Sequence, residues 1–205
     1  MTASRLVLAT RNAHKVEELR DILADVLEQT GLELVDVTEF PDVQDVVESG
    51  VTFAANATLK AEAVASATGL PALADDSGLA VDVLGGSPGV FSARWSGVSG
   101  EGKDRANNDL LLAQLGDVPD EHRGAGFVCA AALAVPGRAT IVREGAVRGL
   151  LGREPRGTNG FGYAPLLVLP DGRALAELTA QEKHAISHRG RAFRLLAQDI
   201  ARELG

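Results

Sequence analysis

The first part of the chain alternates between two kinds of apolar pattern, and this alternation constrains the fold more than any other feature. Residues 6–9 form a short apolar run, as in a buried strand, whereas apolar residues recur at helical spacing between Val16 and Leu27. After a turn at Gly31, residues 32–37 alternate loosely in polarity, as a second strand does. A strand, a helix and a strand in this order predict an α/β fold.

Later segments continue the alternation of helices and strands. Residues 52–68 and 105–115 have helical patterns, and each pattern is followed by a glycine, which is a common helix stop. Residues 71–74 predict a brief strand that runs into Asp75-Asp76-Ser77-Gly78, and residues 79–84 resume an apolar pattern. We therefore expect the acidic pair at the end of a strand.

The C-terminal half predicts a hairpin and further helices. Residues 125–135 and 140–144 flank Pro136-Gly137-Arg138, which is typical of two antiparallel strands and makes the sheet mixed. The glycine-rich stretches 85–102 and 145–162 are interpreted as connections. The remaining predictions are a last strand at 166–169, a helix from near Ala180 with a capping box of Thr179 and Glu182, and an amphipathic helix at 191–204.

Length and charge limit the class of protein. The chain has 205 residues, 45% of them hydrophobic, and contains no linker or internal repeat, so we expect a single domain over residues 1–205. The formal net charge of −8 argues against a nucleic-acid partner, because nucleic-acid binding needs clustered lysine and arginine. A small phosphate ligand is still allowed, since a few well-placed cations can bind one triphosphate.

Cysteine content and the lengths of the apolar runs predict a cytoplasmic protein. The single cysteine, Cys129, lies in an apolar run and is expected to be buried, since it can form no internal disulfide. No stretch approaches the roughly 18 apolar residues of a membrane span, and the first apolar run is too short for a signal peptide. We therefore expect no membrane partner.

A first group of polar residues lies where the first strand hands over to a helix. Thr10, Asn12 and Lys15 stand at the predicted helix N-terminus, where backbone N–H groups and a lysine can bind a phosphate. The alternative is that Thr10 or Asn12 only caps the helix and Lys15 is solvated.

A second group is acidic. Glu48 lies in a predicted loop and Asp75-Asp76 follow a strand, and Mg²⁺ commonly takes one or two carboxylates together with water and substrate phosphate. Adjacent side chains alternate in direction along an extended chain, so one aspartate could face a metal while the other supports the loop. The alternative is a turn, since Asp-Asp-Ser-Gly is also good turn chemistry.

A third group lies toward the C-terminus. Phe161 stands between two glycines, where its ring could present a face to a flat base, although it could equally pack in the core. Lys183, His188 and Arg189 could donate hydrogen bonds to a carbonyl or a phosphate.

Two other patterns are misleading. Residues 97–103 match the spacing of a P-loop, but Asp104 stands where serine or threonine should bind magnesium, and no strand precedes the segment. His184 and His188 are spaced as a helical zinc pair, yet no third ligand is evident.

Several ordered motifs together resemble the inosine/xanthosine triphosphate pyrophosphatases over essentially the whole chain. Each motif is weak by itself, and their order makes the resemblance strong. The motifs are Thr10-x-Asn12-x-x-Lys15, Glu48-Ser49-Gly50-x-Thr52-Phe53 with Asn56 and Lys60, Ala74-Asp75-Asp76-Ser77-Gly78-Leu79, Gly89-x-x-Ser92-Ala93-Arg94-Trp95-Ser96-Gly97, Glu154-Pro155-Arg156-Gly157, Phe161-Gly162-Tyr163 and Ser187-His188-Arg189-Gly190.

The resemblance implies a magnesium-dependent hydrolase that converts ITP, dITP and XTP to the monophosphate and pyrophosphate. It implies an elongated, two-lobed α/β fold with a long central mixed sheet flanked by helices, an active-site cleft between the lobes, and a homodimer. The implied roles are Lys15 and Lys60 on the triphosphate, with Thr10 and Asn12 beside them; Glu48 and Asp75 or Asp76 around Mg²⁺; Asp76 as proton acceptor; Ser77 and the run Phe161-Gly162-Tyr163-Ala164 against substrate; and Lys183, His188 and Arg189 on the base edge.

One position departs from the family pattern. The family usually has an aspartate where this chain has Ala164, so discrimination against guanine is in doubt. This departure motivates one alternative, a nucleotide-binding protein with altered base specificity or lost turnover. A second alternative, independent of Ala164, is a related pyrophosphatase acting on pyrimidine or modified nucleotides.

Overall fold

The structure is a computed structural model that describes residues 4–205, except for the side chain of His14. The prediction that the N-terminus carries no signal peptide lies partly outside these residues. Its strands form one six-stranded sheet in the order β2-β1-β3-β4-β5-β6. Strand β1 pairs in parallel with both β2 and β3, and β5 pairs antiparallel with β6, so the predicted mixed α/β class is confirmed. The strands are β1 Arg5–Leu8, β2 Glu33–Asp36, β3 Ala72–Val81, β4 Gly124–Ala134, β5 Ile141–Leu151 and β6 Leu167–Val168.

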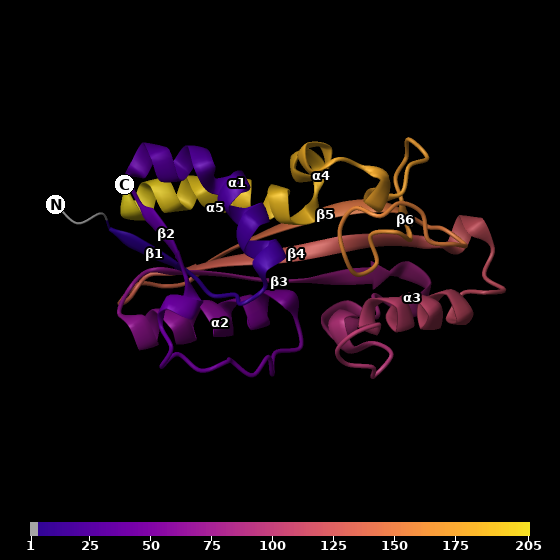
Figure 1. The fold of residues 1–205 in the computed structure, drawn as a ribbon, viewed down its shortest axis with the longest axis horizontal. Coiled ribbons are helices and arrows are strands. Elements are labelled where there is room, and N and C mark those ends of the chain that lie inside the picture. Colours follow the sequence, from indigo (N-terminus) through magenta and orange to yellow (C-terminus); the bar gives the residue numbers. More distant parts are fainter. Residues whose placement is uncertain (1–3) are drawn as a thin grey trace. The chain divides into compact units, whose positions relative to one another are not determined.

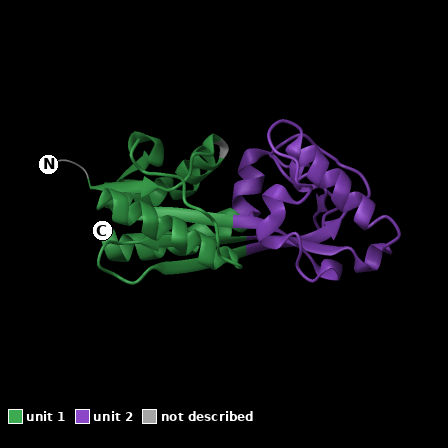
Figure 2. Ribbon diagram, turned by 90° about the horizontal axis from the view of Figure 1, so that it is seen from below, with its two compact units in different colours: residues 1–76, 129–145, 188–205 green, residues 77–128, 146–187 purple. Residues whose placement is uncertain are grey.

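Two compact units divide the chain (Figure 2). Unit 1 comprises residues 1–76, 129–145 and 188–205, and unit 2 comprises residues 77–128 and 146–187. Strands β3, β4 and β5 contribute residues to both units. The helices are α1 Ala13–Thr30, α2 Phe53–Thr68 and α5 His188–Leu204 in unit 1, and α3 Lys103–Gln114 and α4 Ala180–Ile186 in unit 2.

Unit 1 has helices on both faces of its strands: α1 and α5 lie side by side on one face and α2 lies on the other (Figure 1). Strand residues alternate between these faces. Leu6, Leu8 and Leu73 join the core with α1 and α5, whereas Val7 and Ala72 join the core with α2. Because α2 and the strands facing it supply mostly alanine, that helix packs closely on the sheet.

Local sequence signals determine the helix ends. Asn12 caps α1 through a hydrogen bond from the backbone N–H of Lys15 to its Oδ1, and Gly31 ends the helix in the left-handed conformation. Helix α2 begins after Thr52 and ends at Gly69 in the same way. The predicted capping box before α4 is confirmed.

The prediction of a strand end at the acidic pair was wrong. Residues 72–81 form one continuous strand, so Asp75-Asp76-Ser77-Gly78 is extended and not a turn. Gly78 remains in the strand because a side chain there would meet Ser92 Oγ at 2.4 Å and the Gly89 carbonyl oxygen at 2.6 Å. Close packing therefore requires the glycine that had suggested a turn.

The prediction of a connection starting at residue 145 was also wrong, since β5 continues to Leu151. A side chain at Gly145 would meet the carbonyl oxygen of His188 at 2.3 Å and the backbone nitrogen of Ala192 at 2.5 Å, so glycine lets α5 lie against the strand. Helix α5 itself begins at His188, three residues earlier than the periodicity predicted.

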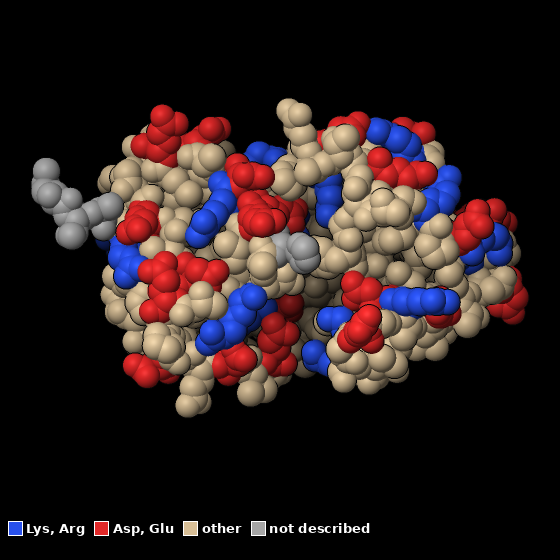
Figure 3. Space-filling view, in the orientation of Figure 1, with Lys and Arg blue, Asp and Glu red and all other residues tan. Residues whose placement is uncertain are grey.

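The core of unit 2 packs α3 against the strands, with Leu111 and Leu115 beside Leu79 and Val81. Within residues 4–205, no helix combines the length and apolar character needed to cross a membrane. On the face drawn in Figure 3, acidic and basic side chains are interspersed.

Candidate active site

Asp75 and Asp76 point to opposite faces of β3. Asp75 contacts Lys15 of α1, and Asp76 contacts Asn56 of α2, in agreement with the alternation of the neighbouring apolar residues. Each carboxylate therefore has its own set of neighbours within unit 1.

On the α1 face, Asp75 is held by two cations. Lys15 Nζ lies 2.9 Å from each carboxylate oxygen, and Arg189 Nε lies 3.3 Å from Oδ2. The Arg189 guanidinium also donates to Glu18 of α1, a residue that the sequence analysis did not single out. Arg189 and Asp75 have side chains only 2% and 1% exposed, so this is a buried ion-pair network.

Burial alone would raise the pKa of Asp75, but the charges of Lys15, Arg189 and Lys60 outweigh burial and hold this pKa well below its ordinary range. Asp75 is consequently an anion that the structure neutralises internally. Two carboxylates, Asp75 and Glu18, face two cations, Lys15 and Arg189, so these four groups balance in formal charge.

On the α2 face, Lys60 lies between two carboxylates. Its Nζ is 2.6 Å from Glu48 Oε1 and 3.8 Å from Asp76 Oδ1. One ammonium facing two carboxylates leaves an excess of negative charge among these three groups. Burial raises the pKa of Asp76, and the charge of Glu48 adds to this effect, although Lys60 and the hydrogen bond from Asn56 oppose it.

Asn56 connects the Glu48 loop to the catalytic candidate Asp76. Its side chain is fully buried, its Nδ2 donates to Asp76 Oδ2 at 2.9 Å, and its Oδ1 accepts from the backbone N–H of Gly50 at 2.8 Å. A side chain at position 50 would lie 2.6 Å from Asn56 Oδ1, so only glycine at this position lets the loop lie so close to Asn56. The sequence analysis noted Asn56 only as part of a motif, because its contact with Asp76 is established only by the folded structure.

At the N-terminus of α1, both predicted polar residues, Thr10 and Asn12, accept hydrogen bonds from nearby backbone N–H groups. The Thr10 hydroxyl accepts from the backbone N–H of Asn12 at 3.2 Å, and Asn12 caps the helix. Capping is therefore established, and the same helix N-terminus next to Lys15 is suited to an anion.

In unit 2, Phe161 and Lys183 come together. The Phe161 side chain is partly exposed, and Lys183 Nζ lies 5.6 Å from the centre of its ring, within the range of a cation–π contact. A side chain at Gly160 would lie 2.8 Å from Lys183 Nζ and 3.7 Å from the Ala164 Cβ. Lys183 and Ala164 thus border the same small space.

The residues around Phe161 are anchored inside unit 2. Tyr163 and Ala164 are 3% and 2% exposed, and the Tyr163 hydroxyl donates to the Ser92 carbonyl at 2.9 Å. Burial raises the pKa of Tyr163, and the charge of Asp104 adds to the shift. Ser77 is half-buried on β3. His188 is the first residue of α5 in unit 1 and is buried.

A family model described as the Ham1 family matches residues 6–199. The chain belongs to the Ham1 family. Similar curated proteins include those of Streptomyces avermitilis and Streptomyces coelicolor, which are 61% and 59% identical; each alignment covers 98% of this chain and 100% of the relative. Both relatives are named dITP/XTP pyrophosphatase, and they confirm the family resemblance predicted from the order of motifs.

Solved structures agree with this Ham1 assignment. A HAM1 protein from Coxiella burnetii is 40% identical and superposes with a TM-score of 0.87, covering 97% of this chain and 99% of that one. A nucleoside-triphosphatase, or dITP/XTP pyrophosphatase, from Mycobacterium abscessus is 50% identical with a TM-score of 0.77, covering 94% and 97% of the two chains.

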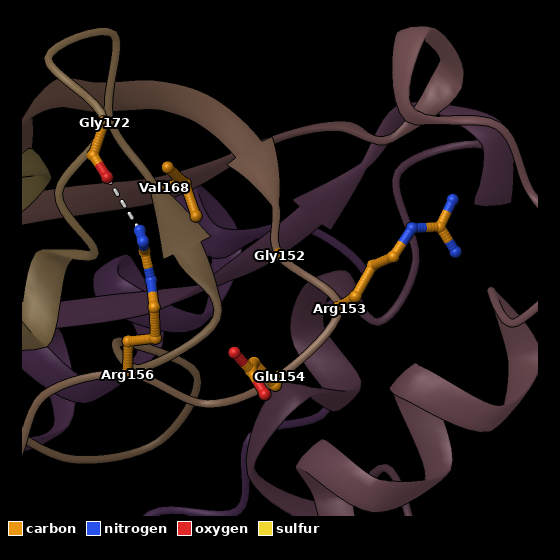
Figure 4. A pocket seen from close by; sticks show the side chains of 6 residues that line it. All are labelled: Gly152, Arg153, Glu154, Arg156, Val168 and Gly172. Atoms are coloured by element: carbon orange, nitrogen blue, oxygen red, sulfur yellow. Dashed lines mark hydrogen bonds between the residues drawn. The ribbon is translucent and has the colours of Figure 1, made fainter.

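Two residues of the predicted motif 154–157, Glu154 and Arg156, border a hollow of about 330 Å³ in unit 2 (Figure 4). Arg156 donates across it to the Gly172 carbonyl at 2.7 Å. A side chain at Gly157 would meet the Ala176 carbonyl oxygen at 2.3 Å. These contacts give the motif a structural role in fastening its loop.

Proposed function

We propose that this Ham1 chain hydrolyses the abnormal purine nucleotides ITP, dITP and XTP to the nucleoside monophosphate and pyrophosphate. The names of relatives up to 61% identical support this activity. The observation that carries it is the arrangement on the α2 face of β3, where Asp76 has a raised pKa beside Glu48 and Lys60.

In this proposal Asp76 is the general base. A water molecule attacks the α-phosphorus, a P–O bond forms, and Asp76 accepts the proton that the water loses. The bond between the α-phosphorus and the bridging oxygen breaks, and pyrophosphate leaves. Lys60 and Lys15 neutralise negative charge on the triphosphate, with Thr10 and Asn12 at the helix N-terminus beside Lys15.

The donor set on the α2 face fits Mg²⁺. No group of three or more histidine, cysteine, aspartate or glutamate side chains gathers as metal ligands within the described part of the chain. Mg²⁺ does not need such a group, since it is commonly bound by one or two carboxylates with water and substrate phosphate. Glu48 and Asp76 are two such carboxylates, and the single positive charge of Lys60 between them does not balance both. We therefore propose Glu48 and Asp76 as the metal ligands.

When bound, Mg²⁺ would supply positive charge to the departing pyrophosphate. Asp75 was predicted as a third candidate ligand. Its carboxylate is already neutralised by Lys15 and Arg189, and we propose that it positions these cations instead.

Base recognition is proposed for the Phe161 region. Within unit 2, the exposed part of the Phe161 ring would stack on the purine and Lys183 would act at the base edge. The family resemblance implies a role at the base edge for His188 and Arg189 as well, with Arg189 acting through its ion pairs because its guanidinium is buried. Hypoxanthine and xanthine carry a carbonyl at purine position 6, whereas adenine carries an amino group that would leave a buried donor unpaired.

Following the family resemblance, we also propose that the protein acts in the cytoplasm as a homodimer.

The test is pyrophosphate release by the purified protein across ITP, dITP, XTP, ATP, GTP, UTP and dTTP, each with Mg²⁺ and with a chelator. Release that is fastest on ITP or XTP and ceases in chelator is expected. Equal rates on all purines would refute the selectivity, and a preference for UTP or dTTP would indicate a pyrimidine enzyme. Binding of ITP with no release would indicate a protein that has lost turnover.

A further inference from the structure

Helix α3 holds both peptide groups of Gly162, the residue after Phe161. The carboxylate of Asp104 accepts from the Gly162 N–H at 2.8 Å, and Asn108 Nδ2 donates to the Gly162 carbonyl at 3.1 Å. Asp104 and Asn108 are four residues apart, so they share one face of the helix. All three residues belong to unit 2.

Gly162 requires this support because of its conformation. Its φ of +64° lies in the left-handed region, and a Cβ there would meet nothing within 4 Å, so the glycine is required for backbone shape and not for space. Gly162 is half-buried, and a glycine can adopt several backbone conformations unless its peptide groups are fixed. The direction of the Phe161 ring depends on that backbone.

Neighbouring contacts fix the other end of the same segment. Tyr163 is buried and bonds to the Ser92 carbonyl, which also accepts from Asn107 of α3 at 3.3 Å. Asn108 is itself buried, and its Oδ1 has no hydrogen-bond partner within the described residues. Burying an amide that is only partly satisfied costs stability, so its contact with Gly162 needs an explanation other than stability alone.

We propose that Asp104 and Asn108 are positioning residues for the nucleobase, which hold the Gly162 peptides so that Phe161 presents its ring in one orientation. This inference rests on the proposed stacking of Phe161 on the base. Neither residue touches the triphosphate chemistry in this scheme. Their loss should therefore weaken binding of the base and leave hydrolysis itself unchanged.

The experiment compares Asp104→Ala, Asn108→Ala and Asp104→Asn with the wild-type protein, and Asp109→Ala is the matched control. Asp109 is also on α3, but its 63%-exposed side chain pairs only weakly, at 3.6 Å, with Arg105. Asp104→Asn removes the charge near the helix N-terminus but keeps an oxygen acceptor for Gly162, which separates the hydrogen bond from the helix dipole. Melting temperatures verify that each variant is folded.

The two alanine variants are expected to raise the Kd for IMP, measured by calorimetry, and the KM for ITP by about tenfold, as for the loss of one hydrogen bond. Their kcat and their inhibition by inorganic pyrophosphate should stay at wild-type levels, because pyrophosphate has no base. Asp104→Asn should recover most of the affinity for IMP, and Asp109→Ala should match wild type.

Wild-type affinity for IMP in folded Asp104→Ala and Asn108→Ala would overturn the inference. So would an equal loss of IMP and pyrophosphate binding, which indicates general structural damage. If Asp104→Ala does not fold, Asn108→Ala decides by the same criteria. Failure of the wild-type protein to bind IMP or release pyrophosphate would refute the proposed function instead.

Discussion

Asp75 and Asp76 are adjacent in the chain, yet Asp75 pairs with Lys15 on one face of β3 and Asp76 lies beside Lys60 on the other. The two carboxylates differ in electrostatic state as a result. The charges of Lys15, Arg189 and Lys60 lower the pKa of Asp75, whereas burial raises the pKa of Asp76. This contrast assigns them different tasks: Asp75 anchors cations, and Asp76 is suited to accept a proton.

Asp76→Asn should abolish turnover while ITP still binds. The change removes the proposed base and keeps the shape of the side chain, so kcat should fall by a factor of about 100 to 10,000, the usual contribution of a general base. Pyrophosphate release gives kcat, and calorimetry gives the affinity for ITP. Near-normal turnover would refute the role of Asp76.

Asp75→Asn should lower the free energy of unfolding by about 3 kcal/mol, because it leaves the buried Arg189 with Glu18 as its remaining carboxylate among the contacts described above. Urea unfolding at neutral pH measures the change, and Asp76→Asn is the matched control. Because burial raises the pKa of Asp76, its negative charge costs stability in the folded state, so the control should not lose stability. Equal effects of the two substitutions would contradict the separation of roles.

Ala164→Asp should sharpen the preference for ITP over GTP by about tenfold. The new carboxylate would border the space next to Lys183, hold that ammonium, and leave less room for the 2-amino group that guanine has and hypoxanthine lacks. Ala164→Asn is a control of equal size without charge. The ratio of kcat/KM for ITP and GTP is the readout, and an unchanged ratio in Ala164→Asp would exclude this position from base choice.

Tyr163 should make stability fall at alkaline pH. Its pKa is raised in the folded protein above the ordinary value of 10.0, so its contribution is complete below that pH and is lost as the pH rises from there through the folded pKa. Tyr163→Phe should remove this part of the loss. Unfolding in urea at several alkaline pH values measures it.

The titration of Tyr163 can be followed directly, because it is the single tyrosine of the chain. Tyrosinate absorbance in the folded protein should develop at a higher pH than in the urea-unfolded protein. Coincident titration curves would show that the folded structure does not shift its pKa.

Local pattern was enough to predict the class of fold and most helices. Periodicity identified α1 and α2, and the caps Asn12, Gly31 and Thr179 are short-range signals that act within a few residues. The order of the motifs was enough for the family. The sequence also placed Glu48, Lys60 and Asp76 among the candidates, but it could not say which of the two adjacent aspartates faces which lysine.

Only the tertiary structure decided those pairings, because they depend on contacts between residues far apart in the chain. Lys15 and Asp75 are 60 positions apart, and Arg189 and Asp75 are 114 apart. The same limit explains the errors at Gly78 and Gly145: a glycine suggests a turn locally, whereas here it is required because another backbone or side chain lies too close for a Cβ. Sequence periodicity thus determined the elements, and packing determined what each polar side chain faces.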